Sequence, residues 1–493
     1  MVTALGLLGL TLAARALLHF PAMSHPRSIS LRDWIGVLQL VFASVAGAGA
    51  LVALIVAYRR QRVAEADSAH DMTRVFNERF IAIAGQLGDL QPAVRFAGVH
   101  ALAGLADDWP EHRQTCVDVL CAYLRMPSAA SAAEWEVRHT VIRVLAAHLR
   151  ASVLVSWQGL NFDFTGVIFD GAEFSQAEFS GGTVDFKDAK FRSGVTGFDR
   201  AVFSGAAVSF ARAEFSGGTV DFNGAQFTGG EVDFNGAQFT GAEVIFSREF
   251  PDSAQSPGRA EFSGATVSFA RAEFIKGTVR FGCSGFSGGF VSFDRAVFSG
   301  AAVSFARAEL SGTAQLYFGR AKCAGSEISF VEAEFSSGTV DFNGAQFTGG
   351  DVSFYRTRFN GTTVSFDEAQ FSRAQSPGGQ VSECEVLFTS EFLRSNISFT
   401  HTVFSAGTTN FINATFKGGT VSFGAEFLTG SQVNFDLSYF SGAMVSFAGA
   451  EFSGGTVTFR DPQESSHPPV FSFAGPPPSG VLLPQGWTQH SGL

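Results

Sequence analysis

The sequence predicts a mainly β chain whose largest part is a β-solenoid, preceded by a membrane-spanning helix and a small α-helical module. Two observations support this prediction. Phenylalanine recurs every twelve residues through most of residues 155–459, and the 493 residues include 55 Phe and 55 Gly. A charge-free apolar stretch, residues 34–58, precedes the repeats. Repetition at a fixed period indicates stacked units, each of which buries its apolar face against its neighbours.

The repeating unit contains two short phrases, for example Val220-Asp221-Phe222-Asn223-Gly224 and Ala225-Gln226-Phe227-Thr228-Gly229. In each phrase a small or branched residue and a Phe flank a polar residue, which is the alternation of a short strand with one buried face. Gly and Ser then supply a corner. The spacing does not fit the 3.6-residue period of a helix. Short strands separated by corners predict a solenoid whose coils pair in parallel and stack their Phe rings inside.

These phrases resemble the pentapeptide-repeat family, whose consensus is a small residue, a polar residue and then Leu or Phe. Ala213-Glu214-Phe215 and Ala225-Gln226-Phe227 match it, and the Phe residues within 164–179 keep its spacing of five. The resemblance implies a right-handed quadrilateral β-helix with the small residue and the Phe facing inward. From Phe186 onward each pair of phrases gains two residues. We therefore expect about 24 residues per coil, and about 12 coils rising on the order of 60 Å.

The N-terminal region predicts membrane insertion. Residues 1–33 form an apolar segment, a candidate first membrane helix, which lacks the charged start and cleavage site of a secretory signal. Residues 34–58 form the predicted transmembrane helix, because about 20 apolar residues cross a bilayer. The basic run 59–62 follows, so the positive-inside rule places the later residues in the cytoplasm. Ala43 and Gly47 form a small-xxx-small face, which is either a homo-oligomer contact or ordinary membrane-helix composition.

Residues 64–151 predict a small α-helical module. Apolar residues recur at helical spacing in four stretches, and Pro92 suits the first turn of the second helix. We expect this module to join the membrane helix to the solenoid and to cover the first coil. The repeats occupy residues 155–459. Residues 460–493 are rich in Pro and predict a mostly disordered tail.

The reactive residues argue against catalysis. Of ten His only His401 lies in the repeats, so no His cluster can serve there as a base or metal ligand. The five Cys are scattered, which disfavours a disulfide framework, and Cys323 stands where the repeat expects an inward Phe. The glycines form no phosphate-binding loop. We therefore expect no enzyme, with no catalytic, cofactor-binding or metal-ligating residue and no cofactor.

The function predicted from the sequence is a non-enzymatic scaffold at the cell membrane, a protein-interaction rod whose bulk lies in the cytoplasm. The whole chain resembles actinobacterial membrane proteins in which a helical segment precedes pentapeptide repeats, and this resemblance implies an architecture and no activity. Its protein partner is not identified by the sequence.

The net charge of −11 supports one alternative function. Residues 155–459 hold 31 Asp and Glu against 19 Lys and Arg. Some pentapeptide-repeat proteins are acidic DNA mimics that bind and protect a topoisomerase, gyrase. A DNA mimic needs a continuous acidic track because phosphate charge is regular, and Lys190, Val202 and Arg358 interrupt that track. We favour the scaffold and expect no direct binding of nucleic acid.

Overall fold

The computed structural model describes residues 30–127, 131–247, 258–375, 381–382, 384–473 and 475–487. The apolar segment predicted for residues 1–33 lies almost wholly outside the described residues. The chain forms two compact units, Met1–Glu78 and Arg79–Leu493. The first unit contains most of one helix, and the second contains the remaining helices and the solenoid.

Helix α2 (Leu31–Leu87) is 57 residues long. Its segment Trp34–Val63 has a mean hydropathy of 2.5, and none of the apolar window is buried inside the protein. The sequence analysis separated the membrane helix, residues 34–58, from the first helix of the module. The two are continuous, because residues 59–87 contain no Pro and a single Gly, and these are the residues that interrupt helices most strongly.

Three α-helices and a short 3₁₀ turn precede the solenoid in the second unit. They are α3 (Pro92–Asp108), η1 (Pro110–His112), α4 (Arg113–Arg125) and α5 (Ala132–His148). Pro92 occupies the first turn of α3, as predicted, where its missing N–H leaves no helical hydrogen bond unmade. The Ser131 hydroxyl accepts a hydrogen bond from the Glu134 N–H at 3.2 Å and caps the start of α5.

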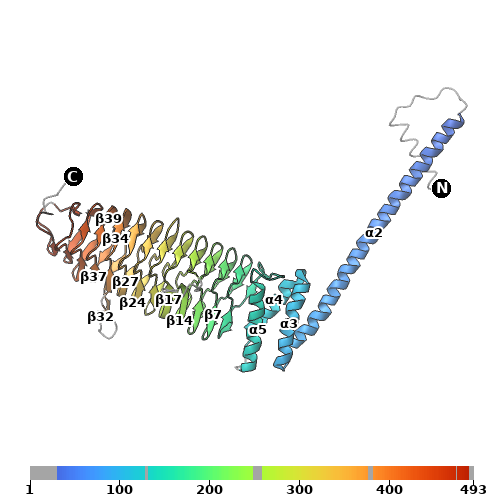
Figure 1. Cartoon of the computed structure of the whole chain (residues 1–493), viewed down its shortest axis with the longest axis horizontal. Coiled ribbons are helices and arrows are strands. Elements are labelled where there is room, and N and C mark those ends of the chain that lie inside the picture. Colours follow the sequence, from blue (N-terminus) through green and yellow to red (C-terminus); the bar gives the residue numbers. More distant parts are fainter. Residues whose placement is uncertain are drawn as a thin grey trace. The chain divides into compact units, whose positions relative to one another are not determined.

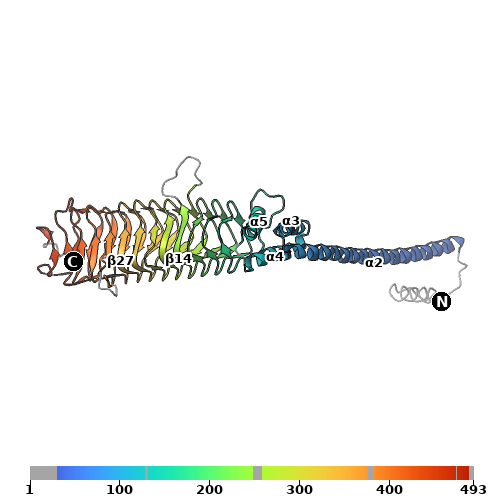
Figure 2. The ribbon, with the colours of Figure 1, turned by 90° about the horizontal axis from the view of Figure 1, so that it is seen from below.

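The solenoid consists of short parallel strands in three sheets of 13, 21 and 11 strands (Figures 1 and 2). The 21-stranded sheet contains two columns of strands, which four long strands connect around a shared corner. These long strands are β14 (Gln238–Ser247), β17 (Glu273–Phe281), β24 (Lys322–Ser329) and β27 (Gln346–Ser353). Each coil therefore has four sides, which confirms the predicted four-sided solenoid.

The strand register fixes the length of a coil. In the 13-stranded sheet β5 (Thr183–Asp185) pairs with β9 (Ala207–Ser209), which pairs with β13 (Glu231–Asp233). Val184 faces Val208 and Val208 faces Val232, so one coil takes 24 residues, as the sequence predicts. Thirteen strands in one column make twelve steps. At about 4.8 Å per step the column rises about 58 Å.

The interior is filled by Phe rings stacked in four ladders, one for each side of the coil. Phe210 stacks on Phe186 at 4.7 Å and on Phe234 at 4.6 Å, with interplanar angles of 3°. Rings of ladders on opposite sides of the coil meet edge to face, as Phe198 meets Phe210 at 5.9 Å. These are the offset and T-shaped geometries that aromatic pairs favour. The ladders form the hydrophobic core of the solenoid.

Two residues replace Phe in these ladders. Cys323 pairs with Phe298 and Phe347 in neighbouring strands and is buried, which confirms the inward position predicted for it. Leu310 stands in the same way between Phe286 and Phe335. The interior therefore accepts another apolar side chain at a Phe position.

Many outward Asp residues next to the Phe ladders have a structural role. The Asp185 carboxylate accepts a hydrogen bond from the Lys187 N–H at 2.8 Å, and Asp221 and Asp341 accept equivalent bonds from the N–H two residues later. Such turns satisfy a backbone donor that a sharp corner leaves without a partner. Some of the acidic residues of the solenoid are therefore needed to stabilise its corners.

The helical module covers the first coil. The Gln114 amide of α4 donates to the Asn161 carbonyl at 2.8 Å and accepts from the Asn161 N–H at 2.9 Å. Arg125 at the end of α4 forms an ion pair with Asp163 of β1 (Phe162–Asp163). The Gln114 contacts pair backbone groups that the first coil would otherwise expose, and the ion pair adds a second link between the module and that coil.

The C-terminal segment differs from its prediction. We expected residues 460–493 to be mostly disordered, but residues 460–473 and 475–487 continue and close the solenoid. Strand β46 (Val470–Phe471) joins the 13-stranded sheet and β47 (Val481–Leu482) joins the 21-stranded sheet. Phe471 stacks on Phe447 at 4.9 Å, and the Trp487 indole meets the Phe440 ring edge-on at 5.4 Å. Aromatic burial stabilises this segment despite its Pro content.

Candidate functional site

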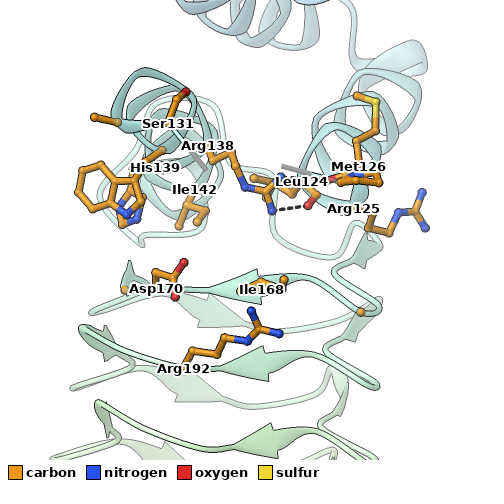
Figure 3. A pocket seen from close by; sticks show the side chains of 15 residues that line it. Leu124, Arg125, Met126, Ser131, Arg138, His139, Ile142, Ile168, Asp170 and Arg192 are labelled. Atoms are coloured by element: carbon orange, nitrogen blue, oxygen red, sulfur yellow. Dashed lines mark hydrogen bonds between the residues drawn. The ribbon is translucent and has the colours of Figure 1, made fainter. Parts of the chain in front are cut away.

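A groove of about 610 Å³ lies between the helical module and the first coils of the solenoid (Figure 3). Its helical side contains Met126, Trp135, Arg138, His139 and Ile142, and its solenoid side contains Ile168, Asp170 and Arg192. The residues come from α4, α5 and two coils, so the fold assembles the groove from segments that are distant in sequence.

The apolar part of the groove is built on α5. The Trp135 ring stacks on His139, four residues later on the same helix face, with ring centroids 3.8 Å apart. Trp135 keeps 46% of its surface exposed and Ile168 keeps 38%. Burial lowers the pKa of His139 below its usual 6.5, so the imidazole is neutral at physiological pH. The indole therefore rests on an uncharged ring and presents an apolar face to the groove.

Three guanidinium groups line the groove: those of Arg125, which pairs with Asp163, and Arg138 are engaged, and that of Arg192 is available. Arg138 donates to the Leu124 carbonyl at 2.5 Å and to the Met126 carbonyl at 3.3 Å, at the C-terminal end of α4. Arg192 makes no side-chain hydrogen bond or ion pair within the described part of the chain. Asp170 accepts a hydrogen bond from the Ser193 hydroxyl at 3.1 Å. An available cation beside an exposed indole suits a peptide that carries apolar and acidic groups.

A second cluster of polar side chains holds the start of the solenoid to the helices. The Trp157 indole donates to the Asp107 carboxylate at 2.9 Å, and the same carboxylate lies 3.2 Å from Nε2 of His148. The His148 ring stacks on Trp157 at 3.9 Å, and Trp157 is fully buried. Nδ1 of His148 lies 2.7 Å from the Val144 carbonyl, so both ring nitrogens have partners, and we assign the cluster to stability.

The four buried cysteine side chains are held as thiols. Burial raises the pKa of Cys116 to about 11 and that of Cys121 to about 12. Burial likewise raises the pKa of Cys384 to about 12 and moves that of Cys323 strongly upward. A thiol becomes a nucleophile or a metal ligand as the thiolate. The described residues contain no group of three His, Cys, Asp or Glu side chains that could hold a metal ion.

The sequence analysis named no site residue, and it did not identify this groove. The only local signal is the pair Trp135 and His139 at helical i,i+4 spacing. Arg192 lies in a different coil, and its position opposite α5 depends on how the module packs on the solenoid. Single-sequence reasoning can place residues on one helix face, but it cannot bring two such distant segments together.

Comparison with known proteins agrees with this architecture. A family model described as pentapeptide repeats, in nine copies, matches residues 198–248. No curated protein and no solved structure matches the chain. Residues 198–248 lie in the solenoid, and the same ladders and register extend on both sides of them. The chain therefore contains pentapeptide repeats, and the matched repeats form part of its four-sided solenoid.

Proposed function

We propose that this protein is a non-enzymatic, membrane-tethered rod that binds other proteins on the cytoplasmic side of the cell membrane. The observation that carries the proposal is the exposed apolar segment Trp34–Val63 in a chain that also contains a rigid pentapeptide-repeat solenoid. This segment has 30 residues. At 1.5 Å per residue it is about 45 Å long, which exceeds the apolar thickness of a bilayer, about 30 Å.

The residues at the end of this segment support the proposed orientation. Arg59, Arg60 and Arg62 follow the uncharged stretch directly, and cytoplasmic flanks of membrane helices are enriched in such residues. Arg62 donates to the Tyr58 hydroxyl at 3.2 Å, and its guanidinium lies 5.7 Å from the centre of that ring. An aromatic ring paired with a cation suits the headgroup layer, and the charge then marks the cytoplasmic surface.

The solenoid supports binding as its role. Its interior is filled by stacked rings, and burial raises the pKa of the Cys323 and Cys384 thiols. Repeat proteins of this kind present long, regular surfaces to partners. The groove beneath α5 is one candidate site for such a partner.

The acidic alternative, a DNA mimic that binds gyrase, gains no support from the contacts described here. Asp221 and Asp341 accept backbone hydrogen bonds at corners, so their presence has a structural reason. One column of outward residues runs Glu178, Val202, Gln226, Glu261 and Gly285, which is not a continuous acidic track. The gyrase interaction stays a prediction from composition.

Carbonate extraction of the full-length protein from membranes tests the tether. The variant Leu40→Arg with Leu54→Arg places two charges in the apolar segment, each costing about 2.5–3.5 kcal/mol at the centre of a membrane helix. We expect the unmodified protein to stay in the membrane pellet and this variant to move to the supernatant. The matched control, Met72→Arg with Ile81→Arg, changes exposed apolar residues of α2 outside the segment and should stay in the pellet. Recovery of the unmodified protein in the supernatant would contradict the proposal.

A further inference from the structure

Four cations line one edge of the solenoid over three successive coils. Arg271, Arg295 and Arg320 occupy the same corner of their coils, and Lys322 begins the strand that follows Arg320. All four are exposed, and they line a shallow groove of about 500 Å³ together with Val297, Gly344 and Gln346. We name Arg271, Arg295, Arg320 and Lys322 the basic ladder.

The three arginines occupy a strained backbone position, as other non-Gly residues do at corners of this solenoid. Their φ angles are 58°, 56° and 55°, in the left-handed region where a side chain causes strain. Gly236 and Gly344 occupy the same corner in the coils on either side, without that strain. Left-handed corners elsewhere on the solenoid also carry arginine, as at Arg200, Arg212 and Arg307, so this backbone position accepts arginine without requiring it.

At two other places on this solenoid, stacked charges alternate in sign and form ion pairs. At another corner Glu332 lies between Arg307, at 2.9 Å, and Arg356, at 3.6 Å. Asp188 pairs with Arg212 at 2.8 Å in the same corner row as the basic ladder. These pairs show that the fold can place an acidic residue beside each stacked arginine.

The basic ladder departs from that alternation. Asp294 lies 3.2 Å from Arg320 and 3.8 Å from Arg295, and Glu273 lies on the strand beside Val297. Arg271 and Lys322 have no ion-pair partner among the residues that the structure describes. Four cations beside two carboxylates leave the ladder with a net positive charge on an acidic solenoid.

A row of opposite charge lies on the same 21-stranded sheet. Glu327 faces Asp351 in the next coil, and Asp351 faces Glu385 in the coil after that. All three are exposed, and none forms an ion pair within the described ranges. Like charges directly opposite one another destabilise a sheet. We name Glu327, Asp351 and Glu385 the acidic ladder.

The two ladders have the same spacing, and this identifies the partner. Each places three charges over two coil steps, about 9.6 Å at 4.8 Å per step. Three acidic residues on one face of an extended peptide would span about 13 Å, and three on successive turns of a helix about 11 Å. A second stack of coils has the same step of about 4.8 Å, so its charges match the spacing of the basic ladder.

We propose that the basic ladder of one copy of this chain binds the acidic ladder of a second copy, so that the solenoids associate side to side. The guanidinium groups of Arg271, Arg295 and Arg320 would pair with the carboxylates of Glu327, Asp351 and Glu385, and each pairing relieves repulsion within both ladders. Because every copy carries both ladders, the contact either closes a dimer or continues into a row of copies. The inference rests on the proposed role of the solenoid as an interaction surface, and it does not require the membrane tether.

Charge reversal in the full-length protein, purified in detergent, tests this contact. One variant carries Arg271→Glu, Arg295→Glu and Arg320→Glu. Glu is tolerated at such a backbone position, since Glu332 and Glu368 have φ angles of 58° and 59°. The second variant carries Glu327→Arg, Asp351→Arg and Glu385→Arg. The control carries Arg200→Glu, Arg394→Glu and Lys417→Glu, which changes the net charge equally at exposed positions outside both ladders, two of them left-handed corners.

Light scattering after size exclusion gives the mass of each sample at about 50 mM and about 500 mM salt. We expect the unmodified protein and the control to associate at low salt and to dissociate at high salt. Each reversal variant alone should lose association by at least about tenfold in Kd, and an equimolar mixture of the two should regain it. Carbonate extraction of the same variants reports the tether independently, so a failure of this contact is distinguishable from a failure of the membrane proposal.

Three results would overturn the inference. The unmodified protein could be a monomer at low salt, the reversal variants could associate as it does, or their mixture could fail to associate. Association that survives both reversals assigns the contact to another surface, such as the small-residue face of α2. Binding of single-stranded DNA or inorganic polyphosphate to the monomer, abolished by the arginine reversals, would assign the basic ladder to a phosphate polymer instead.

Discussion

Replacing Phe234 with Ala tests how the stacked ladders stabilise the solenoid. Phe234 is fully buried and stacks on Phe210 and Phe269, at 4.6 Å from each. Removing the ring leaves a cavity and breaks both stacking contacts. Changes of a buried Phe to Ala cost about 3–5 kcal/mol. The change Phe234→Leu should cost less than Phe234→Ala, because Leu keeps part of the buried apolar volume and Leu310 already fills a Phe position in another ladder.

The loss should be local as well as large. In a repeat protein each unit contacts only its neighbours, so destabilisation is concentrated in adjoining coils. A loss of about 3 kcal/mol corresponds to more than 100-fold faster hydrogen exchange in peptides that open with those coils. Exchange in coils far from the change, such as residues 411–459, should be unaffected.

Hydrogen exchange measured by mass spectrometry on the detergent-purified full-length protein gives both results. Gln226→Ala, at an outward position of the solenoid, is the control and should leave exchange unchanged. The reasoning is refuted if Phe234→Ala and Phe234→Leu give the same exchange, or if the Ala variant accelerates exchange equally along the whole solenoid.

Two further predictions concern pH. Burial raises the pKa of Asp233 and Asp341, so ionising these carboxyls at neutral pH opposes folding. The double change Asp233→Asn with Asp341→Asn keeps a side-chain acceptor for the turn, as Asn410 and Asn434 do. It should raise Tm more at pH 7 than at pH 3.5, because the raised pKa values leave the folded carboxyls mostly protonated at pH 3.5. An equal gain at both pH values would contradict this. Burial lowers the pKa of His139, so its neutral form stabilises the fold above pH 6.5, and this stability is lost as pH falls and the unfolded chain takes up a proton first. The Tm of His139→Gln should therefore fall less than that of the unmodified protein when the pH is lowered from 7.5 to 5.5. Plots of Tm against pH that run parallel for the two proteins would show that His139 does not contribute.

The solenoid was predictable because its signal is local and repeated. Each Phe, with the polar residue before it and the corner after it, defines the same structure in every coil, so even the inward position of Cys323 followed from the spacing. Pro92 at the start of α3 was readable for the same reason. In both cases, neighbouring residues determine the backbone conformation.

The predictions failed where two local sequence patterns indicated different structures, or where the structure depends on residues distant in sequence. The Pro residues near the C-terminus predicted disorder, although Phe471 lies 24 residues after Phe447 and continues its ladder. Arg59 to Arg62 suggested a helix end, but no breaker follows and α2 continues. The groove beneath α5 and the pairing of Asp351 with Glu385, across a 34-residue coil, depend on tertiary packing that spacing alone does not reveal.

The measurement that tests the central claim most directly is a pair of fusions at Leu493, one to green fluorescent protein and one to alkaline phosphatase, expressed in a bacterial host. Green fluorescent protein fluoresces when it folds in the cytoplasm, and alkaline phosphatase is active only after export. The account predicts a fluorescent fusion in the membrane fraction and an inactive phosphatase fusion. An active phosphatase fusion, or a fluorescent fusion recovered wholly in the soluble fraction, would contradict a solenoid held by α2 on the cytoplasmic side of the membrane.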